Sequence, residues 1–349
     1  MIEQKQSVRD NGQMQKSNLH AQNPRNREKS DWTIGRMIDW MSDYLKQHDD
    51  PNPLVSARWL VSDVTGLSFM QLYTNLDLVL VSAELDELRE NVKKRASGVP
   101  LQYITGKTTF RFIDVKIRPG VLIPRPETEV LVSEVLSRLP RDKHVSESEP
   151  PEPDLLVCDL CTGSGCIAAS LAHENPRIMA IATDISSDCA ALASENIKDL
   201  GLGERVEVVE CDLGSGVDDG LMGSFDAIVS NPPYIPSKQM TMLPSEVGEY
   251  EPALALDGGE DGLDLFRRIS KWSIDALKPG GFLACELHED TLDSAAKIAK
   301  DDGFSGVCIV RDLNDLPRIL IAIKQGDSDQ ANLLKPSESS YDENHQAPK

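Results

Sequence analysis

The chain has 349 residues, of which 40% are hydrophobic, so it is long enough to form two domains with buried cores. It contains no run of about eighteen apolar residues that would span a membrane and no secretory signal at its N-terminus, which indicates a soluble cytoplasmic protein. Its net charge of -21 disfavours a nucleic-acid partner, because lysine and arginine side chains must neutralise phosphates in such a complex.

The first part of the chain has a helical pattern that follows a polar leader. Residues 1–30 are polar and aperiodic, which is typical of disorder. Residues 31–106 then carry apolar side chains at helical spacing, and Asn52 followed by Pro53 is a typical helix start. We therefore predict a small helical domain over residues 31–106. Its first helix places these apolar side chains on one face: Ile34, Met37, Ile38, Met41 and Leu45.

A β-hairpin is predicted next, over residues 107–123. This stretch alternates in polarity and is rich in β-branched and aromatic residues, and Pro119-Gly120 is its expected turn. A helix around residues 127–139 and an acidic, proline-rich linker at 141–154 follow the hairpin.

From Leu155 onward strand and helix patterns alternate. This rhythm predicts an α/β fold with a doubly wound, mostly parallel sheet, whose active-site loops lie at the carboxyl ends of the strands. We assign residues 124–325 to this domain. Residues 326–349 are polar and aperiodic, and they predict a disordered tail.

The seven cysteines favour reduced, buried thiols, because most of them lie in apolar strand or helix patterns. Cys158 and Cys161 form a single C-x-x-C, and Cys166 follows in the next helix. There is no second C-x-x-C, and the three thiols need not converge. We therefore expect neither a metal site nor a disulfide.

The first strand of the α/β domain runs into a glycine-rich turn, GSGCIA. Gly163 and Gly165 stand where a strand becomes a helix, so that backbone N–H groups can approach a ligand closely. Asp159 stands near the end of this strand, Asp184 closes the next one and suits ribose hydroxyls, and Asp212 follows the third and suits an adenine amino group. These features fit both a nicotinamide cofactor and S-adenosylmethionine.

The fourth strand, FDAIVS, is followed by the sequence NPPY, which suits methylation of a planar amino group. The side-chain oxygen of Asn231 and the carbonyl of Pro232 can accept both N–H bonds of such a group and turn its lone pair toward a methyl donor. Pro232 and Pro233 carry no competing N–H, and Tyr234 offers a flat face. Positioning then supplies most of the catalysis, and neither a strong base nor a metal is required.

With these motifs the chain resembles the class I S-adenosylmethionine-dependent methyltransferases that modify the glutamine of the Gly-Gly-Gln motif in peptide chain release factors. NPPY is shared with adenine and cytosine amino-methyltransferases, but the combination of further stretches is specific to the release factor enzymes. The match runs from about residue 31 to 324. Its further stretches are GVPLQYITG at 98–106, LIPRPETE at 122–129, EPALALDGGEDGL at 251–263 and DLNDLPR at 312–318.

The resemblance implies a Rossmann-like catalytic domain with an added antiparallel strand, and a helical N-terminal domain that helps to hold the release factor. Residues 231–234 would hold the substrate glutamine, and Phe110 and Arg125 would form walls of the same pocket. We expect the enzyme to be a monomer. The implied cofactor contacts are Thr162, Gly163, Ser164 and Gly165 with the methionine part, Asp184 with the ribose, and Asp212 and Leu213 with the adenine.

One position departs from the common pattern of this family. Cys161 stands where glycine is usual. Because a cysteine at positive φ costs about a kcal/mol or more, we expect an ordinary φ at this position and a slightly narrower pocket.

Four other activities compete with methylation of a release factor. Methylation of a glutamine in a ribosomal protein would use the same NPPY chemistry. Methylation of DNA or RNA fits poorly with the acidic composition. A nicotinamide dehydrogenase would leave NPPY without a role, and a non-catalytic binding protein would not need to keep the chemistry of the pocket.

Overall fold

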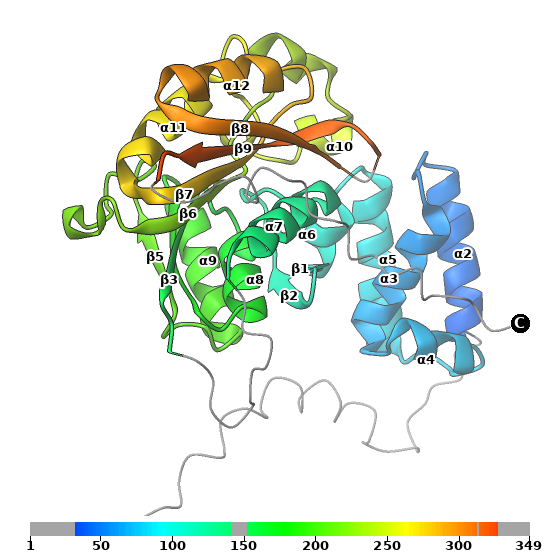
Figure 1. Ribbon diagram of the computed structural model, residues 1–349. Helices are drawn as coiled ribbons and strands as arrows, with labels where there is room; N and C mark the ends of the chain where they lie inside the picture. The colour runs from blue at the N-terminus through cyan, green and yellow to red at the C-terminus, as the bar shows by residue number, and fades with distance from the viewer. Residues whose placement is uncertain (1–31, 141–151, 313, 327–349) are drawn as a thin grey trace, which may run out of the picture. The chain divides into compact units, whose positions relative to one another are not determined.

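The computed structural model describes residues 32–140, 152–312 and 314–326. The chain divides into two compact units, one ending at Thr105 and the other beginning at Gly106 (Figure 1). The predicted leader, most of the acidic linker (residues 141–151) and the tail from residue 327 lie outside the described residues.

The first unit is helical, and the predicted apolar face of its first helix is buried. Ile34 and Met41 lie on this face and pack with Leu60 and Leu88 from two later helices. Asn52 stands at the N-cap position of the second helix, but its side chain makes no capping hydrogen bond to a described residue. The helices are α2 Ile34–Lys46, α3 Pro53–Thr65, α4 Phe69–Thr74, α5 Ser82–Ala96 and α6 Leu101–Thr105.

The second unit opens with the predicted hairpin, formed by β1 Lys107–Phe110 and β2 Ile113–Lys116. The expectation that Pro119-Gly120 makes the hairpin turn is wrong, because the turn lies at Arg111, which has a φ of 51°. Tertiary contacts explain this position: the Arg111 guanidinium donates to Glu174 Oε1 at 2.5 Å and to Ser133 Oγ at 2.6 Å.

Seven strands in the described part of the chain form one sheet, with the order β5-β4-β3-β6-β7-β9-β8. All are parallel except β9, which runs antiparallel to both of its neighbours. The predicted mostly parallel α/β sheet with one antiparallel strand is therefore confirmed. The strands are β3 Leu155–Leu160, β4 Ile178–Asp184, β5 Val206–Glu210, β6 Phe225–Ser230, β7 Leu277–Glu286, β8 Phe304–Arg311 and β9 Pro317–Lys324.

Helices cover both faces of this sheet (Figure 1). On one face lie α7 Pro126–Arg138, α8 Cys166–Glu174 and α9 Ser187–Asp199, and on the other lie α11 Asp264–Ala276 and α12 Leu292–Asp301. The central strand β6 is buried along its whole length. The strand order reverses between β3 and β6, and in such sheets a crevice for ligands opens beyond the carboxyl ends of the strands at this point.

Candidate active site

A cavity of about 330 Å³ lies at the carboxyl ends of β3, β4 and β6. This volume lies within the usual range for small-molecule sites. Its wall is formed by segments that are far apart in the sequence, from Gly120 to Arg268. Many of the predicted site residues line it: Arg125, Thr162, Gly163, Ser164, Asp184, Asp212, Leu213, Asn231 and Pro233.

The glycine loop, residues 161–165, is held against the end of the second strand. Asp184 Oδ2 accepts a hydrogen bond from the backbone N–H of Gly163 at 2.9 Å, and Oδ1 accepts one from Ser186 N at 2.9 Å. Each carboxylate oxygen has a further lone pair, so Asp184 can still accept hydrogen bonds from a ligand in the cavity. Burial raises the pKa of Asp184.

Gly165 has a packing role that its predicted place in the cofactor site did not indicate. It has a φ of 81°, and a Cβ atom at this position would lie 3.1 Å from the Cβ of Ala193 on α9. Gly165 is not among the described residues that line the cavity. The glycine therefore lets α8 start close to α9, which brings the loop to the cavity.

Asp159 lies beneath the loop, away from the cavity wall. It is fully buried, and its Oδ2 accepts hydrogen bonds from Thr162 Oγ1 at 2.6 Å and from Ala168 N at 3.1 Å. Its Oδ1 has no hydrogen-bond partner in the described part of the chain. Burial raises the pKa of Asp159 to about 7. The structure thus gives Asp159 the role of a loop anchor, where the sequence had suggested contact with the cofactor.

The expectation of an ordinary φ at Cys161 is wrong. Cys161 has a φ of 61°, because the chain turns sharply out of β3 so that Thr162 N can donate to the carbonyl of Thr183 at 2.9 Å. A residue with a Cβ atom is strained in this conformation. Cys161 and Cys166 both line the cavity, whereas Cys158 is buried within β3.

Leu213 is another residue in the left-handed region, with a φ of 52°. It follows Asp212, whose carboxylate Oδ2 accepts a hydrogen bond from Arg268 Nη2 at 2.6 Å. Arg268 comes from α11, lines the cavity and was missed by sequence analysis. No local motif marks it, because its contact with Asp212 joins residues that are 56 positions apart.

The NPPY segment separates the large cavity from a second, smaller one of about 100 Å³. Pro232 and Tyr234 line the small cavity, Pro233 lines the large one, and Asn231 lines both. Leu122, Arg125 and Ala255 are also shared. A group held in the small cavity would therefore meet a ligand in the large cavity beside Asn231.

Asn231 has a fixed orientation within this wall. Its Nδ2 donates to Thr128 Oγ1 at 2.9 Å, so its donor end is occupied by the protein. Within the described residues, neither Asn231 Oδ1 nor the Pro232 carbonyl accepts a hydrogen bond. The two acceptors that sequence analysis singled out are therefore both available beside the cavities.

Phe110 does not take the position that the resemblance implied. It is 1% exposed at the end of β1, and it is not among the described residues that line either cavity. Arg125, the other implied wall residue, lines both cavities.

Comparison with known proteins identifies the family to which this site belongs. Residues 36–106 match the PrmC N-terminal domain, and residues 147–246 match the Methyltransferase small domain. The release factor glutamine methyltransferase of Geobacter sulfurreducens is 38% identical over 289 residues, which cover 83% of this chain and 96% of that protein. The chain belongs to the release factor glutamine methyltransferase family. The resemblance seen in the motifs and the expected methyltransferase activity are thereby confirmed.

A second relative agrees with this assignment, and a solved structure of similar description is also matched. The release factor glutamine methyltransferase of Moorella thermoacetica is 39% identical over 251 residues, covering 72% of this chain and 84% of that protein. A solved structure, the release factor-specific protein-(glutamine-N5) methyltransferase of Alicyclobacillus acidocaldarius, is 28% identical and covers 60% of this chain and 99% of that one, with a TM-score of 0.35.

Two family stretches of the methyltransferase meet through an ion pair that the sequence did not reveal. The buried Glu251 carboxylate accepts hydrogen bonds from the Arg125 guanidinium and, at 3.2 Å, from Ile123 N. This contact joins the LIPRPETE stretch to the EPALALDGGEDGL stretch across 126 residues. It fixes Arg125 in the wall that separates the two cavities.

The glycines of the EPALALDGGEDGL stretch allow its backbone to approach NPPY closely. A Cβ atom at Gly262 would lie 2.4 Å from the carbonyl oxygen of Tyr234, and one at Gly258 would lie 2.7 Å from its Cα atom. Larger residues at these two positions would push Tyr234 out of place. The stretch therefore packs against the backbone of Tyr234 and keeps this residue in its position.

Two features are absent from the described residues of the methyltransferase. None of their helices has the length and apolar character needed to cross a membrane. They also contain no group of three or more His, Cys, Asp and Glu side chains placed to hold a metal ion.

Proposed function

We propose that this enzyme transfers a methyl group from S-adenosylmethionine to the side-chain amide nitrogen of the glutamine in the Gly-Gly-Gln motif of class 1 peptide chain release factors. The observation that carries the proposal is the pair of cavities that meet at Asn231. The names of the relatives support the substrate, since they are release factor glutamine methyltransferases.

The large cavity fits the proposed cofactor. Thr162, Gly163 and Ser164 would hold its methionine part, while Gly165 and Asp159 shape and anchor the loop from outside the wall. When bound, S-adenosylmethionine would supply an electrophilic methyl group. Asp184 would accept hydrogen bonds from the ribose hydroxyls, and Asp212 and Leu213 would flank the adenine.

The small cavity suits the acceptor amide. Asn231 Oδ1 and the Pro232 carbonyl would accept the two N–H bonds of the glutamine, which keeps its nitrogen in place and turns the lone pair toward the methyl donor. Pro233 offers no competing N–H, and the Tyr234 ring would support the flat amide. This arrangement supplies catalysis by positioning and by dipoles, and it uses no strong base.

We further propose that the helical domain over residues 31–106 helps to hold the release factor, and that the hairpin over 107–123 links it to the catalytic domain over 124–325. The match to the PrmC N-terminal domain over residues 36–106 supports this division. We propose that the enzyme acts as a monomer in the cytoplasm.

Labelled S-adenosylmethionine tests the reaction directly. The purified enzyme should label an intact release factor and leave a release factor with Gln→Ala in its Gly-Gly-Gln motif unlabelled. Equal labelling of both proteins, or of neither, would refute the proposal.

Asn231→Ala tests the grip on the amide. We expect this variant to lose transfer by about 100-fold or more, because a misplaced acceptor nitrogen cannot line up with the methyl group. Cofactor affinity, measured by calorimetry, should weaken only modestly. Retained turnover with a folded variant would exclude the proposed role of Asn231.

A further inference from the structure

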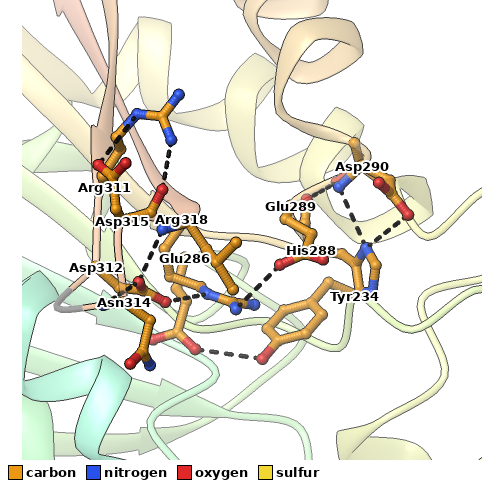
Figure 2. Close-up of polar contacts among 12 residues, drawn as sticks. Tyr234, Glu286, His288, Glu289, Asp290, Arg311, Asp312, Asn314, Asp315 and Arg318 are labelled. Atoms are coloured by element: carbon orange, nitrogen blue, oxygen red, sulfur yellow. Dashed lines mark hydrogen bonds and ion pairs between the residues drawn. The ribbon is translucent and has the colours of Figure 1, made fainter.

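A buried carboxylate lies behind NPPY and has no part in the chemistry proposed above. Glu286 is the last residue of β7 and is 1% exposed. Tyr234 Oη donates a hydrogen bond to Glu286 Oε1 at 3.3 Å (Figure 2). Figure 2 shows the carboxylate pointing toward the phenol of Tyr234. Burying a carboxylate is costly, and here burial raises the pKa of Glu286 to about 7.

Glu286 also interacts with the residue that orients Asn231. Thr128 Oγ1 accepts the hydrogen bond from Asn231 Nδ2 at 2.9 Å, so the hydroxyl proton of Thr128 is left to point elsewhere. The Thr128 side chain stabilises the ionised form of Glu286 and so lowers its pKa, against the effect of burial. Glu286 Oε2 is buried and has no hydrogen-bond partner among the described residues.

The stretch DLNDLPR places a positive charge near Glu286. Arg318, in β9, pairs with Asp312 at 3.3 Å and with Glu289 at 3.6 Å (Figure 2). Its charge lowers the pKa of Glu286, whereas the charge of Glu127 on α7 raises it. Sequence analysis noted this stretch as a family feature but gave it no function.

We propose that Glu286 is a positioning residue for methyl transfer, which holds the phenol of Tyr234. This inference rests on the proposed function, because Tyr234 lines the cavity assigned to the acceptor glutamine. The anchored phenol fixes the ring against which the amide lies.

Kinetics of Glu286 variants test the inference. Glu286→Ala should lower kcat for the release factor by roughly 10- to 100-fold, because the acceptor amide is then held loosely. KM and the Kd of S-adenosylmethionine should stay within about threefold of the wild-type values. Glu286→Gln keeps an acceptor oxygen of the same reach and should restore most of kcat.

Glu289→Gln is the matched control. It removes a carboxylate that also contacts Arg318 and lies three residues further along the chain, but its side chain is 37% exposed and makes no hydrogen bond to Tyr234 or Thr128 among the described residues. Its kcat should equal that of the wild type. A loss as large as that of Glu286→Ala would assign the effect to general charge near Arg318 and overturn the inference.

Tyr234→Phe shows whether Tyr234 and Glu286 act together. This variant should lower kcat in the wild-type background and change it much less in a Glu286→Ala or Glu286→Gln background, because the hydrogen bond is already lost or weakened there. The Glu286→Gln background serves if Glu286→Ala does not fold. Independent, multiplicative effects would overturn the inference, as would a Glu286→Ala enzyme with wild-type kcat or with a raised KM alone.

The outcome for the wild type separates this inference from the proposed function. If the wild-type enzyme does not label the release factor, the proposed function fails. If the wild type is active but Glu286→Ala keeps the wild-type kcat or only raises KM, only the proposed role of Glu286 fails. Coupling between Glu286→Gln and Tyr234→Phe in urea unfolding tests the contact without any substrate.

Discussion

Asn196 on α9 donates a hydrogen bond to the carbonyl of Ser164 in the glycine loop at 2.9 Å. The same amide donates to the carbonyl of Lys116 at 3.1 Å and accepts from Lys116 N at 2.8 Å. One buried side chain therefore joins strand β2 of the hairpin to the loop that forms the wall of the large cavity.

We expect Asn196→Ala to destabilise the catalytic domain and to weaken cofactor binding. Its removal takes the Asn196 partner from the buried carbonyl of Ser164 and from the part-buried N–H and carbonyl of Lys116, which costs about 1–3 kcal/mol in the free energy of unfolding. Urea unfolding and calorimetry with S-adenosylmethionine would measure the two effects. Ser194→Ala, an exposed position on the same helix, is the control and should change neither quantity.

The φ of Cys161 can be tested by comparing two substitutions. At the observed φ of 61°, alanine keeps the strain of a Cβ atom and glycine removes it. We therefore expect Cys161→Gly to have a free energy of unfolding about 1 kcal/mol higher than Cys161→Ala. At an ordinary φ the order would reverse, because glycine loses more backbone entropy on folding. Chemical unfolding of the two variants gives the order.

The ion pair between Arg125 and Glu251 should have an asymmetric mutational cost. Arg125→Met leaves the Glu251 carboxylate buried with Ile123 N as its remaining donor, and we expect a loss of about 2–3 kcal/mol in the free energy of unfolding. Adding Glu251→Gln removes the uncompensated charge and should recover part of this loss. A double variant that is less stable than Arg125→Met would contradict the buried-charge explanation.

The two buried carboxyl groups predict an unusual contribution to stability against pH. Burial raises the pKa of Asp159 from 3.8 to about 7 and that of Glu286 from 4.5 to about 7. A group whose pKa is higher in the folded state than in the unfolded state contributes to the free energy of unfolding at low pH. This contribution is fully present below the unfolded-state pKa and is lost as the pH rises through the folded-state pKa. We expect the contribution of each group to the free energy of unfolding to fall by on the order of 3 kcal/mol as the pH rises from about 4 to 8.

Substitution by the neutral amide isolates these contributions. Glu286→Gln and Asp159→Asn should each lose less stability than the wild type when the pH is raised from about 5 to 8. Other groups also face these carboxyls: Thr162 and Asp184 face Asp159, and Tyr234, Thr128, Arg318 and Glu127 face Glu286. Urea unfolding at several pH values gives the difference from the wild type at each pH. Parallel curves for variant and wild type would contradict the raised pKa.

The sequence by itself determined the helices and strands and the residue types that stand at the ends of the strands. Periodicity predicted the helices and strands because burial on one face imposes it, as the buried face of α2 shows. Asp184 ends β4 and Asn231 directly follows β6. Because the carboxyl ends of parallel strands lie at the same edge of a sheet, these positions alone predicted that the two residues lie at that edge.

Only the tertiary structure decided which side chains contact the NPPY residues. Glu286 meets Tyr234 across 52 residues, and Thr128 meets Asn231 across 103, so no local pattern marks either contact. The position of the hairpin turn and the φ of Cys161 likewise depend on partners elsewhere in the chain. Such contacts follow from strand order and helix packing, which bring together residues whose spacing in the sequence carries no periodic signal.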